Sequence, residues 1–327
     1  MLVSQIDIRE FRGIRRCEKP LEFTRFTVLV GKNNAGKSAV LEAIYLLLAS
    51  HEYVSRAYGI PTLKILQELH GGASSLVYGY SGIAGVEYTI DGSKIGVETD
   101  GGKTRLVRDG KEVSTEWFAS TLNINLSGGN ADTAFFMVPS DTAFLKKLAD
   151  NLMLEKNWNP VVKSGAHVRI AKLVSRCVDD SYTEALISPN ELRLRKELPD
   201  GNFFYVKISD LGSGLKRAVP VMLWLEAFQP GVVLWDDLEI SAHPSLVKQL
   251  LTWLSEKDMQ VVISTHSIDV LSQLLEVKPK EAQVIMLKKT AEDILCHNTL
   301  SIDDLETVMD FAQHDPRLIA GALEGTR

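Results

Sequence analysis

One short stretch of the chain has the residue types and the spacing that bind phosphate groups. Residues 31–38 fit the pattern G-x-x-x-x-G-K-[ST], in which glycines let the backbone curl so that its N–H groups face phosphate oxygens. In this pattern the Lys37 amine reaches the β- and γ-phosphates of a nucleotide, and the Ser38 hydroxyl ligates Mg²⁺. The other loop residues that we expect to bind phosphate are Gly31, Asn33, Asn34, Ala35 and Gly36.

A strand and a helix must hold this loop in position. The apolar run 26–30 predicts a buried parallel strand, and the apolar residues between Ala39 and Leu48 predict a helix directly after the loop. The N-terminus of that helix adds a partial positive charge aimed at the same phosphates. A glycine-rich turn that ends in an ordinary helix cap is the alternative, and the flanking strand and helix favour the phosphate site.

Acidic residues and a histidine follow two other strands. Residues 232–235 are apolar and precede Asp236 and Asp237, a pattern in which the first carboxylate holds Mg²⁺ and the second polarises the attacking water. Glu239 is a second candidate for either task. His266 ends another apolar run about thirty residues further on. One helix and one strand fit this spacing, so we expect neighbouring parallel strands and a histidine that reaches the γ-phosphate or the water.

Composition limits the class of protein. The chain has 327 residues, of which 45% are hydrophobic and 24% charged, as in an ordinary globular protein with a large core. It has no apolar stretch of about 18 residues, so we expect no membrane-spanning helix, and its mixed opening is not typical of a signal peptide. Three widely spaced cysteines suit a reducing cytoplasm, and a net charge of −6 argues against a generally basic nucleic-acid binder.

The remaining elements are expected from alternation, apolar stripes and turn residues. Asp-Gly turns separate short strands and indicate an antiparallel sheet. Two helices broken near 157–160 and a hairpin across 199–202 are expected in the middle of the chain. Strands are expected at 2–9, 75–79, 85–91, 94–99, 103–108, 135–138 and 283–287, and helices within 142–180, at 244–256 and after Ser301.

The opening of the chain adds a resemblance to a known family. Residues 6–14 read Ile-x-Ile-x-x-Phe-Arg-Gly-Ile about twenty residues before the phosphate loop, and with Asn-Asn-Ala-Gly-Lys-Ser this resembles the SMC, RecF and OLD-type ATPases of the ABC superfamily. The resemblance implies an α/β P-loop NTPase fold: an ABC-type ATPase head with a flanking antiparallel β-sheet and a helical lobe. It also implies ATP and Mg²⁺ as ligands. We expect a single domain over 1–327, with lobes at 1–140, 141–230 and 231–327.

A loop that opens a later helix matches the signature loop of this superfamily. Ser213 and Gly214 stand in Leu-Gly-Ser-Gly-Leu-Lys-Arg, where free N–H groups and a hydroxyl can bind an anion. In the superfamily this loop caps the γ-phosphate bound to the other subunit, which implies a head-to-tail homodimer with ATP between its subunits. An N-capped helix is the alternative. Only about seventy residues separate Asp141 from this motif, too few for the long coiled coil of SMC proteins.

Two positions in the site depart from the family pattern. Asp237 replaces the usual catalytic glutamate and is one methylene shorter, which predicts slow hydrolysis. No glutamine follows the run 135–138, where the family senses Mg²⁺ and the γ-phosphate. Ser140 or Asp141 could substitute for it, or the segment is a plain strand-end turn.

Two further predictions concern His243 and the segment that follows His266. His243 before Pro244 either shapes the dimer interface or caps a helix. About sixty residues follow His266, so we expect no TOPRIM nuclease domain of the OLD type. A separate nuclease or effector protein is therefore an expected partner.

The function implied by the resemblance is Mg²⁺-dependent ATP binding with slow hydrolysis, a nucleotide-driven switch in DNA repair, DNA maintenance or antiviral defence. A dimeric ATP-binding scaffold with little hydrolysis and the ATPase subunit of a transporter are the alternatives. DNA contact is a further hypothesis; the other interpretation is a solvated surface and, for Arg12, a nucleotide contact. The basic clusters are Arg9, Arg12, Arg15 and Arg16 and, further on, Arg193, Arg195 and Lys196.

Overall fold

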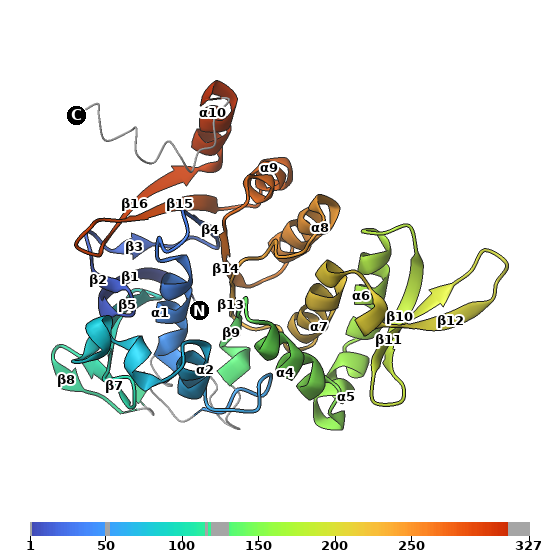
Figure 1. Ribbon diagram of the computed structural model, residues 1–327, viewed down its shortest axis with the longest axis horizontal. Coiled ribbons are helices and arrows are strands. Elements are labelled where there is room, and N and C mark those ends of the chain that lie inside the picture. The colour runs from blue at the N-terminus through green and yellow to red at the C-terminus, as the bar shows by residue number, and fades with distance from the viewer. Residues whose placement is uncertain (1, 50–52, 115–116, 119–130, 313–327) are drawn as a thin grey trace.

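The core of the protein is one large mixed β-sheet with helices packed against it (Figure 1). This computed structural model describes residues 2–49, 53–114, 117–118 and 131–312. The central strands pair in parallel in the order β15, β4, β14, β13 and β9, and most of their residues are buried. They span Ala282–Lys289, Phe26–Val30, Gln260–Thr265, Val232–Trp235 and Phe135–Val138.

The N-terminal antiparallel strands continue the same sheet. The order β8-β7-β6-β5-β1-β2 joins the core through β16, which pairs in parallel with β2 and antiparallel with β15. The predicted antiparallel sheet is therefore confirmed, but the prediction of a strand at 75–79 is wrong, because 3₁₀ turns occupy Ala73–Leu76 and Tyr78–Tyr80. The strands are β1 Val3–Phe11, β2 Ile14–Cys17, β3 Leu21–Glu22, β5 Ala84–Ile90, β6 Ser93–Thr99, β7 Thr104–Arg108, β8 Lys111–Glu112 and β16 Ile294–Ser301.

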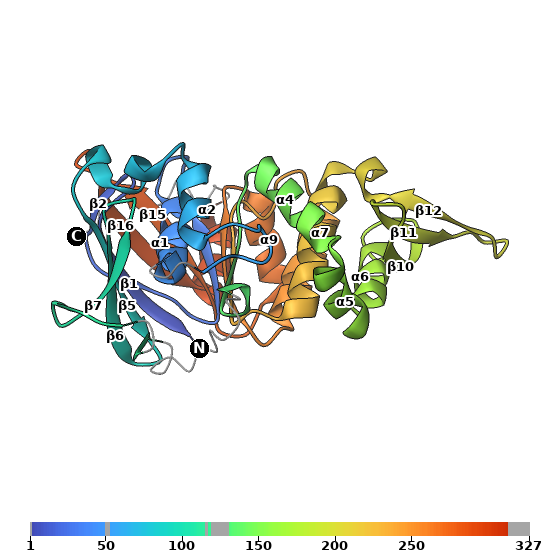
Figure 2. The same ribbon diagram turned by 90° about the horizontal axis from the view of Figure 1, so that it is seen from below.

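Helix α1, Lys37–Ala49, lies inside the half of the molecule that the large sheet forms (Figure 2). It is apolar on every side, and it contacts β1 of the antiparallel part as well as β14, β13 and β9 of the parallel part. A helix that is hydrophobic all round must be enclosed, and the sheet encloses it from both parts. The helices nearby are α2 Thr62–Leu69, α8 Pro244–Ser255, α9 Ile268–Val277 and α10 Ile302–Ala312. No helix in the described part of the chain is long and apolar enough to cross a membrane.

Four helices and a small sheet extend from the end of β9. They are α4 Thr142–Leu152, α5 Glu155–Lys163, α6 Ala166–Ser175 and α7 Ser213–Phe228, with the antiparallel strands β10 Ser181–Ile187, β11 Leu192–Glu197 and β12 Phe203–Lys207. Short helices and strands thus make up the segment between Asp141 and α7, which the sequence predicted to be too short for a long coiled coil. The division into lobes 1–140, 141–230 and 231–327 remains a prediction.

The predicted helix break at 157–160 is wrong, because these residues lie inside α5. Pro160 cannot donate to the carbonyl of Lys156 four residues earlier. That carbonyl accepts a hydrogen bond from the Arg56 guanidinium instead, so the proline is tolerated. The chain breaks on either side of α5, and at the second break Gly165 takes a left-handed backbone with φ of +73°.

Candidate functional site

The phosphate loop joins β4 to α1. Gly31 approaches β15 so closely that a Cβ atom there would lie 2.6 Å from the Leu287 carbonyl oxygen, which excludes every larger residue. Gly36 and Asn34 take positive φ angles of +100° and +65°, a conformation that glycine and asparagine adopt at least cost. The exposed residues of the loop are Lys32, Asn33 and Asn34, whereas Ala35 is buried.

Lys37 lies folded over the loop that it is expected to serve. Its ammonium group donates to the carbonyl oxygens of Gly31, at 3.1 Å, and Lys32, at 3.4 Å. The residue is only 8% exposed, and both acceptors are neutral. Phosphate oxygens are stronger acceptors for an ammonium group, so a nucleotide in this loop would compete well for Lys37.

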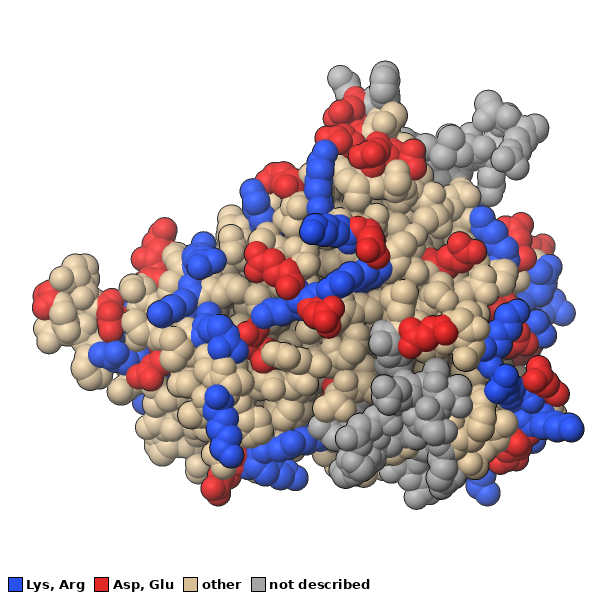
Figure 3. All heavy atoms as spheres, turned by 180° about the vertical axis from the view of Figure 1, so that it is seen from behind, with Lys and Arg blue, Asp and Glu red and all other residues tan. Residues whose placement is uncertain are grey.

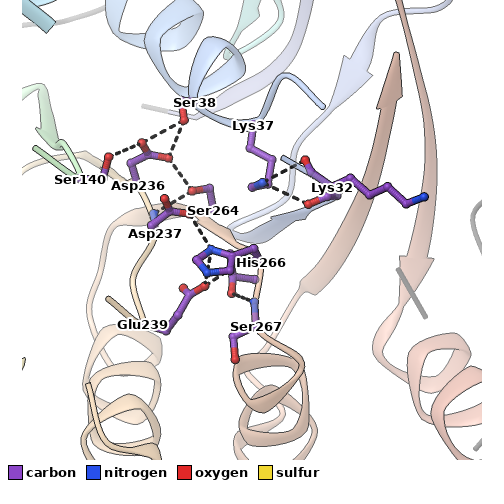
Figure 4. A network of polar contacts seen from close by, with 12 residues as sticks. Lys32, Lys37, Ser38, Ser140, Asp236, Asp237, Glu239, Ser264, His266 and Ser267 are labelled. Atoms are coloured by element: carbon purple, nitrogen blue, oxygen red, sulfur yellow. Dashed lines mark hydrogen bonds and ion pairs between the residues drawn. The ribbon is translucent and has the colours of Figure 1, made fainter. Parts of the chain in front are cut away.

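Asp236 is surrounded by three serine hydroxyls, which come from the start of α1, from β14 and from the segment after β9 (Figure 4). Ser38, at the start of α1, donates to its two carboxylate oxygens at 3.1 and 3.0 Å. Ser264 of β14 donates at 2.6 Å, and Ser140 beyond β9 at 3.2 Å. Burial raises the pKa of the Asp236 carboxyl above its ordinary value; the Ser264 hydrogen bond lowers it, and the neighbouring charge of Asp237 raises it again.

Asp237 and His266 meet where β13 and β14 end. The prediction of neighbouring parallel strands is confirmed, since Trp235 pairs with Ile263. Asp237 has a left-handed backbone with φ of +47°, and its N–H donates to the Ser264 hydroxyl at 2.8 Å. This backbone turn brings its carboxylate to 3.4 Å from His266 Nδ1.

Glu239 is also part of this cluster. Its Oε1 atom accepts the backbone N–H of His266 at 2.9 Å and lies 3.1 Å from the imidazole Nδ1. The carboxylate therefore orients the histidine that follows β14. The three catalytic candidates of the sequence, Asp237, Glu239 and His266, lie within contact of one another.

Arg12 lies beside the same site but is bound to other side chains. Its guanidinium forms an ion pair with Glu42 of α1 at 2.8 Å and contacts His70 Nδ1 at 3.1 Å. Because an arginine can only donate, His70 Nδ1 must be the acceptor, and its Nε2–H donates to Glu42 at 2.9 Å. These three residues line a cavity of about 330 Å³ whose other walls include Ser38 and Asp236.

A second cavity lies on the opposite side of the phosphate loop. It measures about 590 Å³ and is lined by loop residues 30–35 and by the end of β15 with the turn after it. Nucleotide phosphates on the loop would therefore have open volume on both sides, toward Asp236 and toward β15.

The signature-like loop and the phosphate loop begin helices with different main neighbours. Helix α7 packs mainly on α4, α5 and α6 and contacts β9 through an aromatic stack, whereas α1 packs on the large sheet. Ser213 is exposed, but Gly214 is buried, and a Cβ atom there would lie 2.6 Å from the Ser241 carbonyl oxygen. The glycine thus permits close packing within the subunit. His243 caps α8 by accepting the Ser245 N–H, as one of its two interpretations predicted.

Sequence reasoning missed three residues of the site. Ser264 bridges both aspartates, and Glu42 and His70 hold Arg12. The signal for Ser264 was present, because it stands two residues before His266 on a strand expected beside Asp236. Glu42 could be placed one helical turn after Ser38, but nothing in the spacing indicates His70, which comes from the end of another helix.

Comparisons with known proteins agree with this geometry. Residues 1–108 match the family described as "AAA ATPase domain", and residues 138–272 match "AAA domain, putative AbiEii toxin, Type IV TA system". The DNA replication and repair protein RecF of Vibrio campbellii is 41% identical over 59 residues, 18% of this chain and 16% of that protein. RecF of Trichlorobacter lovleyi is 36% identical over 91 residues, 28% and 23% of the two chains. The chain thus matches less than a quarter of each of these relatives.

Solved structures match over nearly the whole chain. The SmcHead bound to the C-winged helix domain of ScpA superposes with a TM-score of 0.63 at 16% identity, covering 95% of this chain and all of that one. The SMC head domain from Thermotoga maritima gives 0.54 at 14% identity, covering 92% and 100%. The chain has the fold of an ABC-type ATPase head and resembles the SMC and RecF-type heads, as its motifs predicted.

Proposed function

We propose that this protein binds ATP with Mg²⁺ and hydrolyses it slowly at sites shared between two subunits. The observation that carries the proposal is the contact of Ser38 with both carboxylate oxygens of Asp236, at 3.1 and 3.0 Å. A phosphate loop hydroxyl and a strand-end carboxylate meet in this way where an Mg²⁺-nucleotide is held.

The residues present fit Mg²⁺. Ser38 and Asp236 offer oxygen atoms, the ligands that this hard cation prefers, and the buried carboxylate has a raised pKa because its charge is poorly solvated. A cation at this point would offset that cost. Ser38 and Asp236 would hold Mg²⁺, which when bound supplies neutralisation of phosphate charge.

The other residues have roles in the hydrolysis that we propose. Lys37 would exchange its carbonyl partners for phosphate oxygens. Asp237 would polarise the attacking water, and His266, oriented by Glu239, would contact the γ-phosphate or that water. Since Asp237 is one methylene shorter than a glutamate, its carboxylate would be held short of the best position and turnover would be slow.

The exposed position of Ser213 supports a head-to-tail homodimer. Ser213 lies exposed at the first position of α7, so its hydroxyl and the N-terminus of this helix are open to a nucleotide on a second subunit. Gly214 would act by letting α7 approach Ser241. ATP would favour the closed dimer and hydrolysis the open form.

Four measurements test this proposal. Wild-type protein should bind ATP with Mg²⁺ and release phosphate slowly, and Lys37→Ala should do neither. ATP should convert the monomer to a dimer in light scattering, most clearly in Asp237→Asn. Ser213→Arg should abolish that dimer while leaving nucleotide binding to the monomer. ATP binding without dimerisation would refute the composite site, and equal binding by Lys37→Ala would refute the nucleotide site.

One second function is favoured by a specific observation. A nucleotide-controlled scaffold that scarcely hydrolyses ATP fits the short Asp237 side chain, which is 3.4 Å from His266 and so already has a partner. In that case ATP would keep the dimer closed around a partner protein. Phosphate release no faster than in Lys37→Ala, with an ATP-dependent dimer, would decide for the scaffold.

The RecF relatives, which are named for DNA replication and repair, support DNA maintenance as the setting. As partners we propose DNA and a separate nuclease or effector protein, and as the location the cytoplasm. Lysines and arginines on the face in Figure 3 are interspersed with acidic residues. Arg193 and Arg195 are paired with Glu191 and Glu197, at 3.2 and 3.0 Å. The exposed pair Arg15 and Arg16, on β2, is therefore the DNA contact that we propose.

A further inference from the structure

Three side chains beside the proposed nucleotide site have the spacing of ligands around one ion. An oxygen of Asp237, an oxygen of Glu239 and a ring nitrogen of His266 all lie within 4.8 Å of one another. The imidazole Nδ1 is 3.4 Å from Asp237 Oδ1 and 3.1 Å from Glu239 Oε1. Ligands about 2.1 Å from a tetrahedral zinc ion are roughly 3.4 Å apart, so little movement would bring these donors onto one ion.

The burial of Glu239 is an independent indication. Its side chain is 11% exposed, and among the described residues no group donates a hydrogen bond to its buried Oε2 atom. A buried carboxylate oxygen without a donor costs free energy. A cation bound by both oxygens of this carboxylate would remove that cost.

An ion could enter from solvent. A cavity of about 370 Å³ is lined by Glu239 and His266, and the His266 side chain is 53% exposed. Asp236 is not part of the cluster, because its oxygens are bound by Ser38, Ser140 and Ser264. The cluster is thus separate from the position that we propose for Mg²⁺.

We propose that Asp237, Glu239 and His266 bind a divalent transition-metal ion, with zinc the best match to one imidazole and two carboxylates at tetrahedral spacing. Three protein ligands leave one position open for water. The ion would engage the carboxylate and imidazole that hydrolysis needs, so ATP would stay bound and unhydrolysed while zinc is present. This consequence rests on the proposed function, whereas the binding itself does not.

The test is equilibrium dialysis of the full chain against Zn²⁺ without nucleotide, in millimolar Mg²⁺, with Co²⁺ absorption as a second readout. Wild-type protein should bind one equivalent. His266→Ala and Glu239→Gln should each weaken binding at least about tenfold, the loss that follows removal of even a supporting group. His243→Ala, which changes the nearby histidine that caps α8, is the matched control and should bind zinc normally. Thermal unfolding of each variant checks that it is folded.

Lys37→Ala separates this proposal from the proposed function. This variant should lose ATP binding and keep zinc binding. The metal site can therefore be confirmed even if the protein does not hydrolyse ATP. The proposal is overturned if wild-type protein binds no zinc or if millimolar Mg²⁺ removes it. It is also overturned if His266→Ala and Glu239→Gln bind as wild type does. Cys177 is a free cysteine next to Ser245, and Asp236 is the proposed Mg²⁺ ligand. Loss of binding in Cys177→Ser or Asp236→Asn, and not in the His266 and Glu239 variants, would overturn the proposal as well.

Discussion

Ser264 gives the sharpest prediction, because its buried hydroxyl holds both acids at the end of β13. It donates to Asp236 at 2.6 Å and accepts the Asp237 N–H at 2.8 Å. Ser264→Ala removes one hydrogen bond to a carboxylate and leaves one backbone N–H without its partner. The variant keeps the size of the side chain nearly unchanged, so its effect is confined to these two hydrogen bonds.

The loss of these two hydrogen bonds sets the expected change in the free energy of unfolding. A hydrogen bond to a charged group contributes about 1.5–3 kcal/mol, and an N–H group left unsatisfied costs about 1–3 kcal/mol. We expect Ser264→Ala to lower the free energy of unfolding by about 2.5–6 kcal/mol. Ser264 is also the donor that most lowers the pKa of Asp236. In the variant that pKa rises further, so the pH below which Mg²⁺-ATP binding is lost should move upward.

Urea unfolding followed by tryptophan fluorescence at neutral pH measures the first effect, and a fluorescent ATP analogue titrated over pH measures the second. Ser272→Ala is the matched control. Within the described part of the chain the Ser272 hydroxyl donates only to the Ile268 carbonyl one turn earlier in α9, and we expect a change within about 0.5 kcal/mol. If Ser264→Ala unfolds with the wild-type free energy and binds Mg²⁺-ATP with the same pH dependence, the assignment of Ser264 as the bridge is wrong.

Three further predictions concern turnover, pH and DNA. Asp237→Glu should raise the rate of phosphate release about ten- to hundredfold, since it restores about 1 Å of reach; an unchanged or lower rate would favour the scaffold. Asp132 lies buried in the 3₁₀ turn before β9. Burial raises the pKa of its carboxyl from 3.8 to about 6, so the folded state binds this proton more tightly than the unfolded state does, and the free energy of unfolding should fall by about 3 kcal/mol as pH rises from about 4 to 6. Asp132→Asn should abolish this fall, which urea unfolding at several pH values measures. If the variant shows the same fall as the wild type, the buried Asp132 carboxyl is not its cause. The double variant Arg15→Ala, Arg16→Ala should reduce the slope of log affinity for DNA against log salt concentration by about 1 for each phosphate that it no longer neutralises. Arg195→Ala, which removes an arginine paired with Glu197, is the control and should leave the slope unchanged. If the double variant and the wild type have equal slopes, Arg15 and Arg16 do not contact DNA phosphates.

The sequence predicted the centre of the fold because the signals there are local and strong. The run 26–30, the glycine loop and the apolar residues of α1 form one uninterrupted strand, loop and helix, and the structure has each of them. The spacing between Asp236 and His266 predicted parallel neighbours for the same reason, since a strand, a helix and a strand leave few arrangements. The helix predicted after Ser301 is also present, and Ser301 caps it: its N–H donates to the Asp304 carboxylate, and its hydroxyl accepts the Asp304 N–H.

The errors came from segments whose conformation depends on distant partners. Asn157–Pro160 has helix-breaking composition, yet Arg56 supplies the hydrogen bond that Pro160 cannot. Residues 75–79 contain the short apolar run 76–78, as a buried strand would, but Phe11 pairs with Val77 only as an isolated bridge, and the chain around it forms 3₁₀ turns. Neither partner can be found from local pattern.

The sequence by itself determined the fold class, the phosphate loop and the two aspartates, because each is encoded in consecutive residues. Only the tertiary structure decided which side chains complete the site. Ser264 reaches Asp236, His70 holds Arg12, and Glu239 turns toward His266 because strands and helices far apart in the chain end at the same place. Such contacts depend on how whole helices and strands pack together. Packing is driven mainly by the burial of apolar surface, which is not directional. The spacing of residues along the chain therefore does not reveal these contacts.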